Sequence, residues 1–348
     1  MKDVVQLKQV IERIHHEHVI IEAHRDCYEQ IYLRNHGHQR PLHDSMIPRL
    51  EKGGIDLVFY AIGGDTLAHS DGTNTPLRAT LQNLDYYYQE AVEGSKIQTV
   101  LTSTDLPLQG PNGKIHYLLH LEGGLPLEGK ISSLRMLYRL GVRSIQLTWN
   151  GRNELGEGVK ERNHGGGLST FGVEVVKEAQ NLGMLIDVSH LSGPGVDDIL
   201  DLAELPIIAS HCNAAKVHDH PRNLSDDRII GIARTGGVVG LHFKPAYIHA
   251  TQNTIERLID HLDYMVELVG IDHLGIGPDF TKSDGPRSPR ENGYNDKQKR
   301  VLEVTEIDEL PLFTEALLRR GYTEEDISKI YGGNFLRVLK QVLDKSGI

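Results

Sequence analysis

Short apolar segments of strand length alternate with amphipathic segments of helical length, and this alternation constrains the fold more than any other feature of the chain. Eight segments are expected to be strands: Val19–His24, Ile55–Ile62, Ile115–Leu121, Ser144–Trp149, Met184–Ser189, Pro206–Ser210, Gly237–Phe243 and His273–Gly277. They are apolar on both faces, which is typical of a parallel sheet covered by helices.

The expected helices are Pro76–Val92, Ser132–Leu140, Thr170–Leu182, Gly195–Ala203, Ser225–Thr235, Thr254–Val269 and Glu309–Arg320. Eight alternations predict an α/β fold, a (β/α)8 TIM barrel with long strand-to-helix loops, in one domain over residues 1–348. An open doubly wound sheet is the alternative, but no G-x-G-x-x-G follows the first strand and no G-x-x-x-x-G-K-[ST] occurs. Three long polar loops are expected to wall or cover the active site: Gly63–Thr75, Asn150–Ser169 and Thr281–Leu310.

The net charge, the lengths of the apolar runs and the cysteine content indicate which binding partners and which compartment to expect. A net charge of -11 and a pI of about 5.9 do not favour a nucleic-acid or anionic-membrane surface, which would need clustered Lys and Arg. No apolar run approaches the roughly 20 residues that span a bilayer, and residues 1–18 indicate an amphipathic helix rather than a secretory signal. The two cysteines, Cys27 and Cys212, make no disulfide framework, so we expect a cytoplasmic protein.

Several expected strands end in side chains that bind metals or transfer protons. The first ends in His24 and Asp26, which alternate along the strand and therefore share a face. The others end in Glu122, His190, His211 and Asp279. Barrel closure would bring all six to one opening, the face where barrel enzymes keep their chemistry.

Each of these residues also has an ordinary structural explanation. A buried histidine can be a hydrogen-bonded core residue, Glu122 a turn residue, and Asp279 a helix cap. Together, however, several carboxylates at one opening would be costly without a cation. Two metals that share one carboxylate would use five ligands and leave an open position for water.

The chain resembles the membrane dipeptidase (renal dipeptidase) family, peptidase family M19, within the amidohydrolase-like metallo-barrels. The resemblance rests on segments that run in family order from about residue 20 to residue 340: AHRD, LEGG, LTWNGRNELGEG, GLSTFGVEVVKEAQNLGMLIDVSHLS, PIIASHCNAAKVHDHPRNLSDDRI, GGVVGLHF, GIGPDF and GGNFLRVL. The DVSHLS and ASHCNA…DHPRN segments are highly specific, whereas AHRD alone is not.

The resemblance implies a binuclear zinc dipeptidase that cleaves dipeptides by attack of a metal-bridging water. His24 and Asp26 would bind one zinc, His190 and His211 the second, and Glu122 would bridge both. Asp279 matches the catalytic aspartate that handles the proton between the water and the leaving amine.

The resemblance also implies a dipeptide-like substrate and a homodimer. Arg222 matches the arginine that contacts the dipeptide, and Tyr247 matches, more loosely, a tyrosine that contacts it. Trp149 and Asn150 are expected to line the substrate site.

The sequence departs from the family pattern at three places. Arg25 replaces the usual asparagine between the first two ligands, and we expect it to point away from the metals and to pair with an acid. Trp149 stands where animal enzymes carry a histidine that polarises the scissile carbonyl, and an indole cannot be cationic. The usual DFDG reads DFTK at 279–282, which keeps the aspartate and alters the loop behind it.

Two other functions stay open at this point. The same metallo-barrel could act on another small amide, a lactam or an ester, because its long loops differ. It could also be a non-catalytic metal-binding homologue, although Asp279 and Arg222 argue against that.

Overall fold

The computed structural model describes residues 2–65, 75–161, 165–280 and 304–345. Within them, nine parallel strands form one sheet: β1 (Ile21–Asp26), β2 (Leu57–Gly64), β3 (Ile97–Thr99), β4 (Ile115–Glu122), β5 (Val142–Gln146), β6 (Leu185–Asp187), β7 (Ile208–Ala209), β8 (Val238–Leu241) and β9 (Leu274–Ile276). Eight of them follow one another in the order β1-β2-β4-β5-β6-β7-β8-β9.

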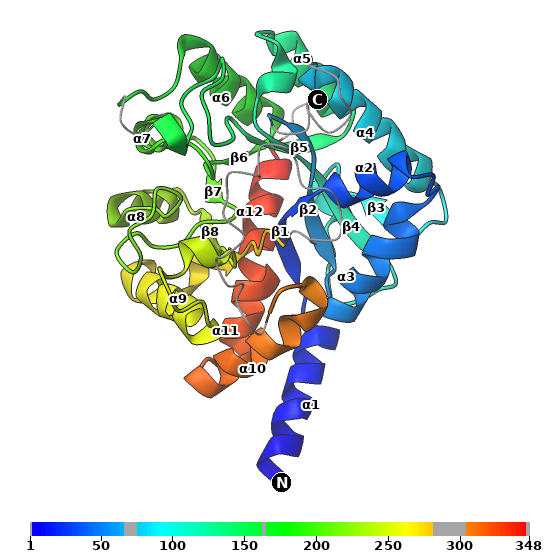
Figure 1. The fold of residues 1–348 in the computed structure, drawn as a ribbon, viewed down its shortest axis with the longest axis vertical. Coiled ribbons are helices and arrows are strands. Elements are labelled where there is room, and N and C mark those ends of the chain that lie inside the picture. The colour runs from blue at the N-terminus through cyan, green and yellow to red at the C-terminus, as the bar shows by residue number, and fades with distance from the viewer. Residues whose placement is uncertain (1, 66–74, 162–164, 281–303, 346–348) are drawn as a thin grey trace.

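The eight strands curl into a nearly closed barrel. β1 lies beside β9, although no ladder between these two strands is found in the described ranges. Helices surround the strands (Figure 1). They are α1 (Lys2–Glu17), α2 (Tyr28–Asn35), α3 (Ile47–Gly53), α4 (Pro76–Glu90), α5 (Ile131–Arg139), α6 (Thr170–Leu182), α7 (Gly193–Leu202), α8 (Asp226–Arg234), α9 (Ile255–Val269), α10 (Leu310–Arg320), α11 (Glu324–Ser328) and α12 (Asn334–Leu343). The predicted α/β barrel is confirmed.

All seven expected helices are present, with bounds within two residues of the prediction. Helices α2, α3 and α11 were not predicted, and neither was the three-residue strand β3. β3 lies outside the ring because it pairs with the first three residues of β4, whereas β5 pairs with the last four. The predicted strand Ser144–Trp149 is shifted: it begins at Val142, which pairs with Leu119, and ends before Trp149.

Helix α12 closes the barrel at the end where the strands begin. Its apolar side chains pack with the first residues of the strands in one buried cluster that includes Ile21, Leu57, Leu185, Ile208, Val238, Phe335, Val338 and Val342. A Cβ on Gly275 would lie 2.2 Å from the Phe335 ring, so glycine is needed there for the close approach. Helix α12 does not cover the carboxyl ends of the strands, and the polar side chains lie at that end, as the sequence pattern predicts.

The predicted loops are described only in part. Residues 66–74, 162–164 and 281–303 lie outside the described residues, so none of the three predicted loops can be followed along its whole length. The Asn150–Ser169 loop packs against the segment after β6: the Val159 amide donates to the His190 carbonyl at 2.9 Å, and the Ser192 amide to the Glu157 carbonyl at 2.8 Å. No helix in the described ranges is long and apolar enough to cross a membrane.

Candidate metal centre

All six residues predicted from the strand ends lie at the carboxyl end of the barrel. His24 and Asp26 belong to β1, and Glu122 is the last residue of β4. His190, His211 and Asp279 follow the ends of β6, β7 and β9 by two or three residues. Because parallel strands end on the same side of a barrel, residues separated by more than 250 positions come together.

Two of these residues are held in a strained backbone conformation. His190 has φ 71° and Asp279 has φ 55°, the left-handed region that L-residues other than glycine avoid. Glu128 is the other described non-glycine residue with positive φ. Such a conformation costs on the order of 1–3 kcal/mol and tends to occur where function requires it.

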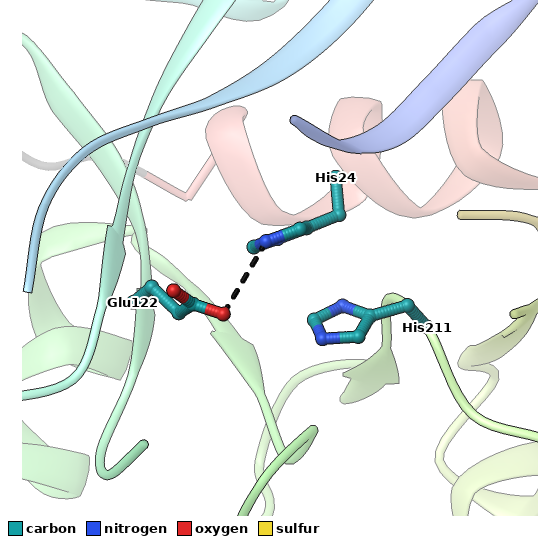
Figure 2. Close-up of side chains that lie close together, drawn as sticks. All are labelled: His24, Glu122 and His211. Carbon is teal, nitrogen blue, oxygen red and sulfur yellow. Dashed lines mark ion pairs between the residues drawn. The ribbon is translucent and has the colours of Figure 1, made fainter. Parts of the chain in front are cut away.

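The ligand-type atoms converge on one point. His24 Nε2 lies 3.4 Å from Glu122 Oε1 and 3.7 Å from Asp26 Oδ1. His190 Nε2 lies 3.1 Å from Glu122 Oε1 and 2.9 Å from His211 Nε2. Figure 2 shows His24, Glu122 and His211 directed into one shared space. Glu122 is therefore in contact with the histidines of both proposed ligand pairs.

The centre fits a bound cation. Both ring nitrogens of His24 are buried without a hydrogen-bond partner among the described residues, although carboxylates stand nearby. Two sets of side chains offer ligand atoms within 4.8 Å of one another: His24, Glu122 and His211, and His24, Asp26 and Asp279. Imidazole nitrogen and carboxylate oxygen are ligands that zinc binds.

The buried carboxylates of the centre also favour a positive charge beside them. Burial, reinforced by the Asp26 carboxylate, raises the pKa of Glu122 to about 7. Burial lowers the pKa of His24, but the Asp26 and Glu122 carboxylates outweigh it and raise that pKa well above its usual value. The carboxylates thus draw a proton onto His24, and a divalent cation would meet the same demand.

His190 and His211 are in surroundings that favour their neutral forms, the forms that bind metals. Burial, followed by the charge of Arg222, lowers the pKa of His190, and burial, followed by the charge of His24, lowers the pKa of His211. His190 Nδ1 lies 2.9 Å from Asn150 Oδ1, and His211 Nδ1 lies 2.7 Å from Ser210 Oγ. A proton held on Nδ1 by these oxygens leaves the Nε2 lone pair free to bind a metal.

Two glycines on neighbouring segments pack against the backbone just before His211. A Cβ on Gly240 or Gly277 would lie 1.9 or 1.8 Å from the Ser210 carbonyl oxygen. Only glycine at these positions of β8 and after β9 lets the end of β7, and with it His211, approach so closely.

Arg25 points away from the centre and pairs with an acid, as predicted. Its Nε and a terminal nitrogen donate to the two oxygens of Glu22 at 2.8 and 2.7 Å, and both side chains are buried. Strict alternation would put Glu22 on the face opposite Arg25. The register of β1 against β2 shifts between these two residues, and this irregularity lets them face each other.

The predicted substrate residues surround the centre. Arg222 is only 3% exposed, and its three guanidinium nitrogens have no oxygen or nitrogen partner among the described residues. It lies over the Tyr247 ring at 5.7 Å. The Trp149 ring stacks on His190 with centroids 6.0 Å apart, and Asn150 contacts His190 as described above.

Sequence reasoning missed two residues beside Asp279. His242 Nε2 lies 3.1 Å and Lys244 Nζ 2.5 Å from Asp279 Oδ2. Burial opposes the effect, but Lys244 and then His242 hold the pKa of Asp279 well below its usual value. His242 directly follows β8 in GLHF, so the strand-end pattern that identified the six predicted residues could also have found it.

Comparison with known proteins agrees with this geometry. Residues 8–346 match the family described as membrane dipeptidase (peptidase family M19). The chain is 32% identical over 309 residues to dipeptidase verJ of Clonostachys rogersoniana, covering 86% of this chain and 76% of that protein. It is 28% identical to human dipeptidase 3, over 93% of this chain and 63% of the human protein.

A solved structure shares the fold. The metallo peptidase of Rhodobacter sphaeroides, liganded with a phosphinate mimic of the dipeptide L-Ala-D-Ala, superposes with a TM-score of 0.79 at 22% identity, over 94% of this chain and 99% of that one. The match across nearly the whole sequence and the histidines and carboxylates gathered at the barrel opening lead to one conclusion: the chain belongs to the membrane dipeptidase family, peptidase family M19.

Proposed function

We propose that this protein is a zinc-dependent dipeptidase with two metal ions, which hydrolyses the amide bond of dipeptides. The observation that carries the proposal is the convergence of ligand-type side chains on His24, whose two buried ring nitrogens have no hydrogen-bond partner among the described residues. These side chains are Asp26, Glu122, His211 and Asp279. Membership of the M19 family supports the reaction class.

Each ligand has a proposed place. His24 and Asp26 would hold one zinc, and His190 and His211 would hold the other. Glu122 lies 3.4 Å from His24 and 3.1 Å from His190 and would serve both. Bound zinc supplies a lowered pKa of water and a polarised substrate carbonyl.

Arg222 is the proposed anchor for the substrate carboxylate. A buried guanidinium without hydrogen-bond partners is costly, and a carboxylate can accept two parallel bonds from its planar fork. Trp149 stacks on the ligand-type histidine His190, and Tyr247 lies beneath the guanidinium of Arg222. The dipeptide would therefore be oriented by its C-terminal end.

Asp279 is the proposed proton carrier. It accepts a proton from the attacking water and delivers it to the leaving amine nitrogen, the double role of a general base and acid. Lys244 and then His242 hold the pKa of this carboxyl below its usual value, so the group is an anion at neutral pH and can take the role of proton acceptor.

The experiment measures metal content and dipeptide cleavage together. The purified chain is stripped with a chelator, reloaded with zinc and given L-Ala-L-Ala, L-Ala-D-Ala and a wider dipeptide set. We expect the loaded protein to release free amino acids and the stripped protein to be inactive.

Asp279→Asn should retain its metal and lose turnover by about 100-fold or more, the usual contribution of a general acid–base group. Asp272→Asn is the matched control, because Asp272 is exposed and precedes β9 at the opposite end of the barrel. Near wild-type turnover in Asp279→Asn would refute the proton role.

Cleavage of another amide, a lactam or an ester, with all dipeptides untouched, would instead assign a different substrate. Less than one metal per chain without any hydrolysis would indicate a non-catalytic homologue.

We also propose a homodimer in the cytoplasm. Light scattering coupled to size-exclusion chromatography tests the dimer, and cell fractionation tests the location. The two cysteines are free and buried, which is compatible with a reducing compartment.

A further inference from the structure

A lysine and a histidine from the end of β8 hold the carboxylate of Asp279. Lys244 Nζ lies 2.5 Å and His242 Nε2 lies 3.1 Å from the same oxygen, Oδ2. Asp279 and His242 are buried, whereas about a third of the Lys244 side chain is exposed. The ammonium group therefore reaches inward from the rim of the barrel opening.

The strand that carries Asp279 does not itself fix this side chain. β9 ends at Ile276, and Asp279 follows three residues later in the left-handed backbone region at φ 55°. The segment is instead tied to β8, because the Phe243 amide donates to the Pro278 carbonyl at 3.3 Å. The position of the carboxylate thus depends on contacts from the neighbouring strand.

Hydrogen bonds fix the backbone at the end of β8. The His242 amide donates to Asn213 Oδ1 and the Asn213 amide group donates back to the His242 carbonyl, both at 2.9 Å. The His242 ring also packs against Tyr247 with centroids 4.8 Å apart. Lys244, two residues further on, starts from this anchored backbone.

Both donors lie closest to the same oxygen, Oδ2. Two donors on one oxygen limit the rotation of the carboxylate about its χ2 torsion, which is otherwise broad. The second oxygen is then presented in a defined direction. His24 and Asp26 lie on the side of Asp279 where the metal centre forms, since their ligand atoms come within 4.8 Å of it.

We propose that Lys244 is a positioning residue for the reaction: together with His242, it clamps Oδ2 of Asp279 so that Oδ1 faces the attacking water and the leaving amine. The inference rests on the proposed role of Asp279 as proton carrier. An exposed lysine–aspartate pair would contribute little, but Asp279 is buried, and loss of the ammonium removes its charged donor.

The first test compares Lys244→Met, Lys244→Arg and the control Lys329→Met in the zinc-loaded protein. Lys329 is a matched control because it is exposed to a similar degree and pairs with Asp272 at 3.0 Å, away from the site. In Lys244→Met we expect kcat to fall about 10- to 100-fold, the scale of a misplaced catalytic group, with KM within about 3-fold. Lys244→Arg should recover part of kcat, Lys329→Met should match the wild type, and metal content should not change.

A double-mutant cycle tests whether Lys244 acts through Asp279. In the Asp279→Asn background, Lys244→Met should cause no further loss of kcat, because the group that it positions is no longer functional. Equal, additive losses in both backgrounds would overturn the proposal. So would wild-type kcat in Lys244→Met, a rise in KM alone, or loss of metal along with activity.

A crystallographic comparison remains decisive even if no dipeptide is cleaved and the proposed function fails. In zinc-loaded crystals, the Asp279 carboxylate should be ordered in the wild type and rotated or disordered in Lys244→Met. An unchanged carboxylate in the variant would overturn the positioning role, whatever the substrate.

Discussion

Replacing Arg25 by methionine is expected to destabilise the protein, because the change leaves a buried carboxylate without its partner. Arg25 is 3% exposed and Glu22 0%, and two charge-assisted hydrogen bonds of 2.8 and 2.7 Å join them. Loss of one partner of a buried ion pair costs about 3–5 kcal/mol of the free energy of unfolding. Methionine retains most of the apolar stem, so the charge is the main loss.

The loss should depend on pH in a direction that the pKa of Glu22 determines. Burial raises this pKa even in the presence of Arg25, which opposes the shift, and without Arg25 it must rise further. A carboxyl with a raised pKa in the folded state is stabilising while protonated, and that contribution is lost as the pH rises through its folded pKa. The gap between Arg25→Met and wild type should therefore be widest near pH 8 and should narrow toward about pH 5.

The assay is urea unfolding of the zinc-loaded proteins, followed by circular dichroism at both pH values. The variant Glu22→Gln/Arg25→Met removes both charges and should regain most of the stability. Arg135→Met is the control for an exposed pair, with Glu178, and should change little. Wild-type stability in Arg25→Met, or a gap that does not change with pH, would refute the reasoning.

Two further predictions concern the metal centre. Zinc affinity should rise steeply as the pH increases through about 7, because Glu122, whose pKa burial raises to about 7, must lose its proton and His24 must be neutral to bind. Competition with a fluorescent chelator between pH 6 and 8 measures this, and a flat affinity would exclude these ligands. Ser210→Ala should weaken zinc binding by about 10- to 100-fold, because it removes the oxygen 2.7 Å from His211 Nδ1. The same competition assay at fixed pH checks it, and an unchanged affinity would show that Ser210 does not orient the ring.

Much of the fold could be predicted because its signals are local. Each barrel strand is a short apolar run, and each main helix has an apolar stripe with helical spacing, so their order is readable without tertiary information. β3 escaped prediction because only one of its three residues, Ile97, is apolar, and the shifted bounds of β5 depend on its pairing with β4. His15 lies in a polar stretch that indicates a solvated side chain, but it is buried, 2.9 Å from the Gly53 carbonyl and 2.7 Å from Thr314 Oγ1.

The sequence by itself determined which side chains would gather at the opening. His24, Glu122 and His211 meet because each lies within two residues of the carboxyl end of a parallel strand. The parallel strands of a barrel all end on one side, whatever the conformation of their loops. Only the tertiary structure decided what holds those side chains in place. The pairing of Arg25 with Glu22 needs an irregular register in β1. The clamp of Lys244 on Asp279 needs the segments that follow the neighbouring strands β8 and β9 to meet. Such contacts depend on backbone angles and on distances of a few ångströms between segments, and these are set by how the whole chain packs.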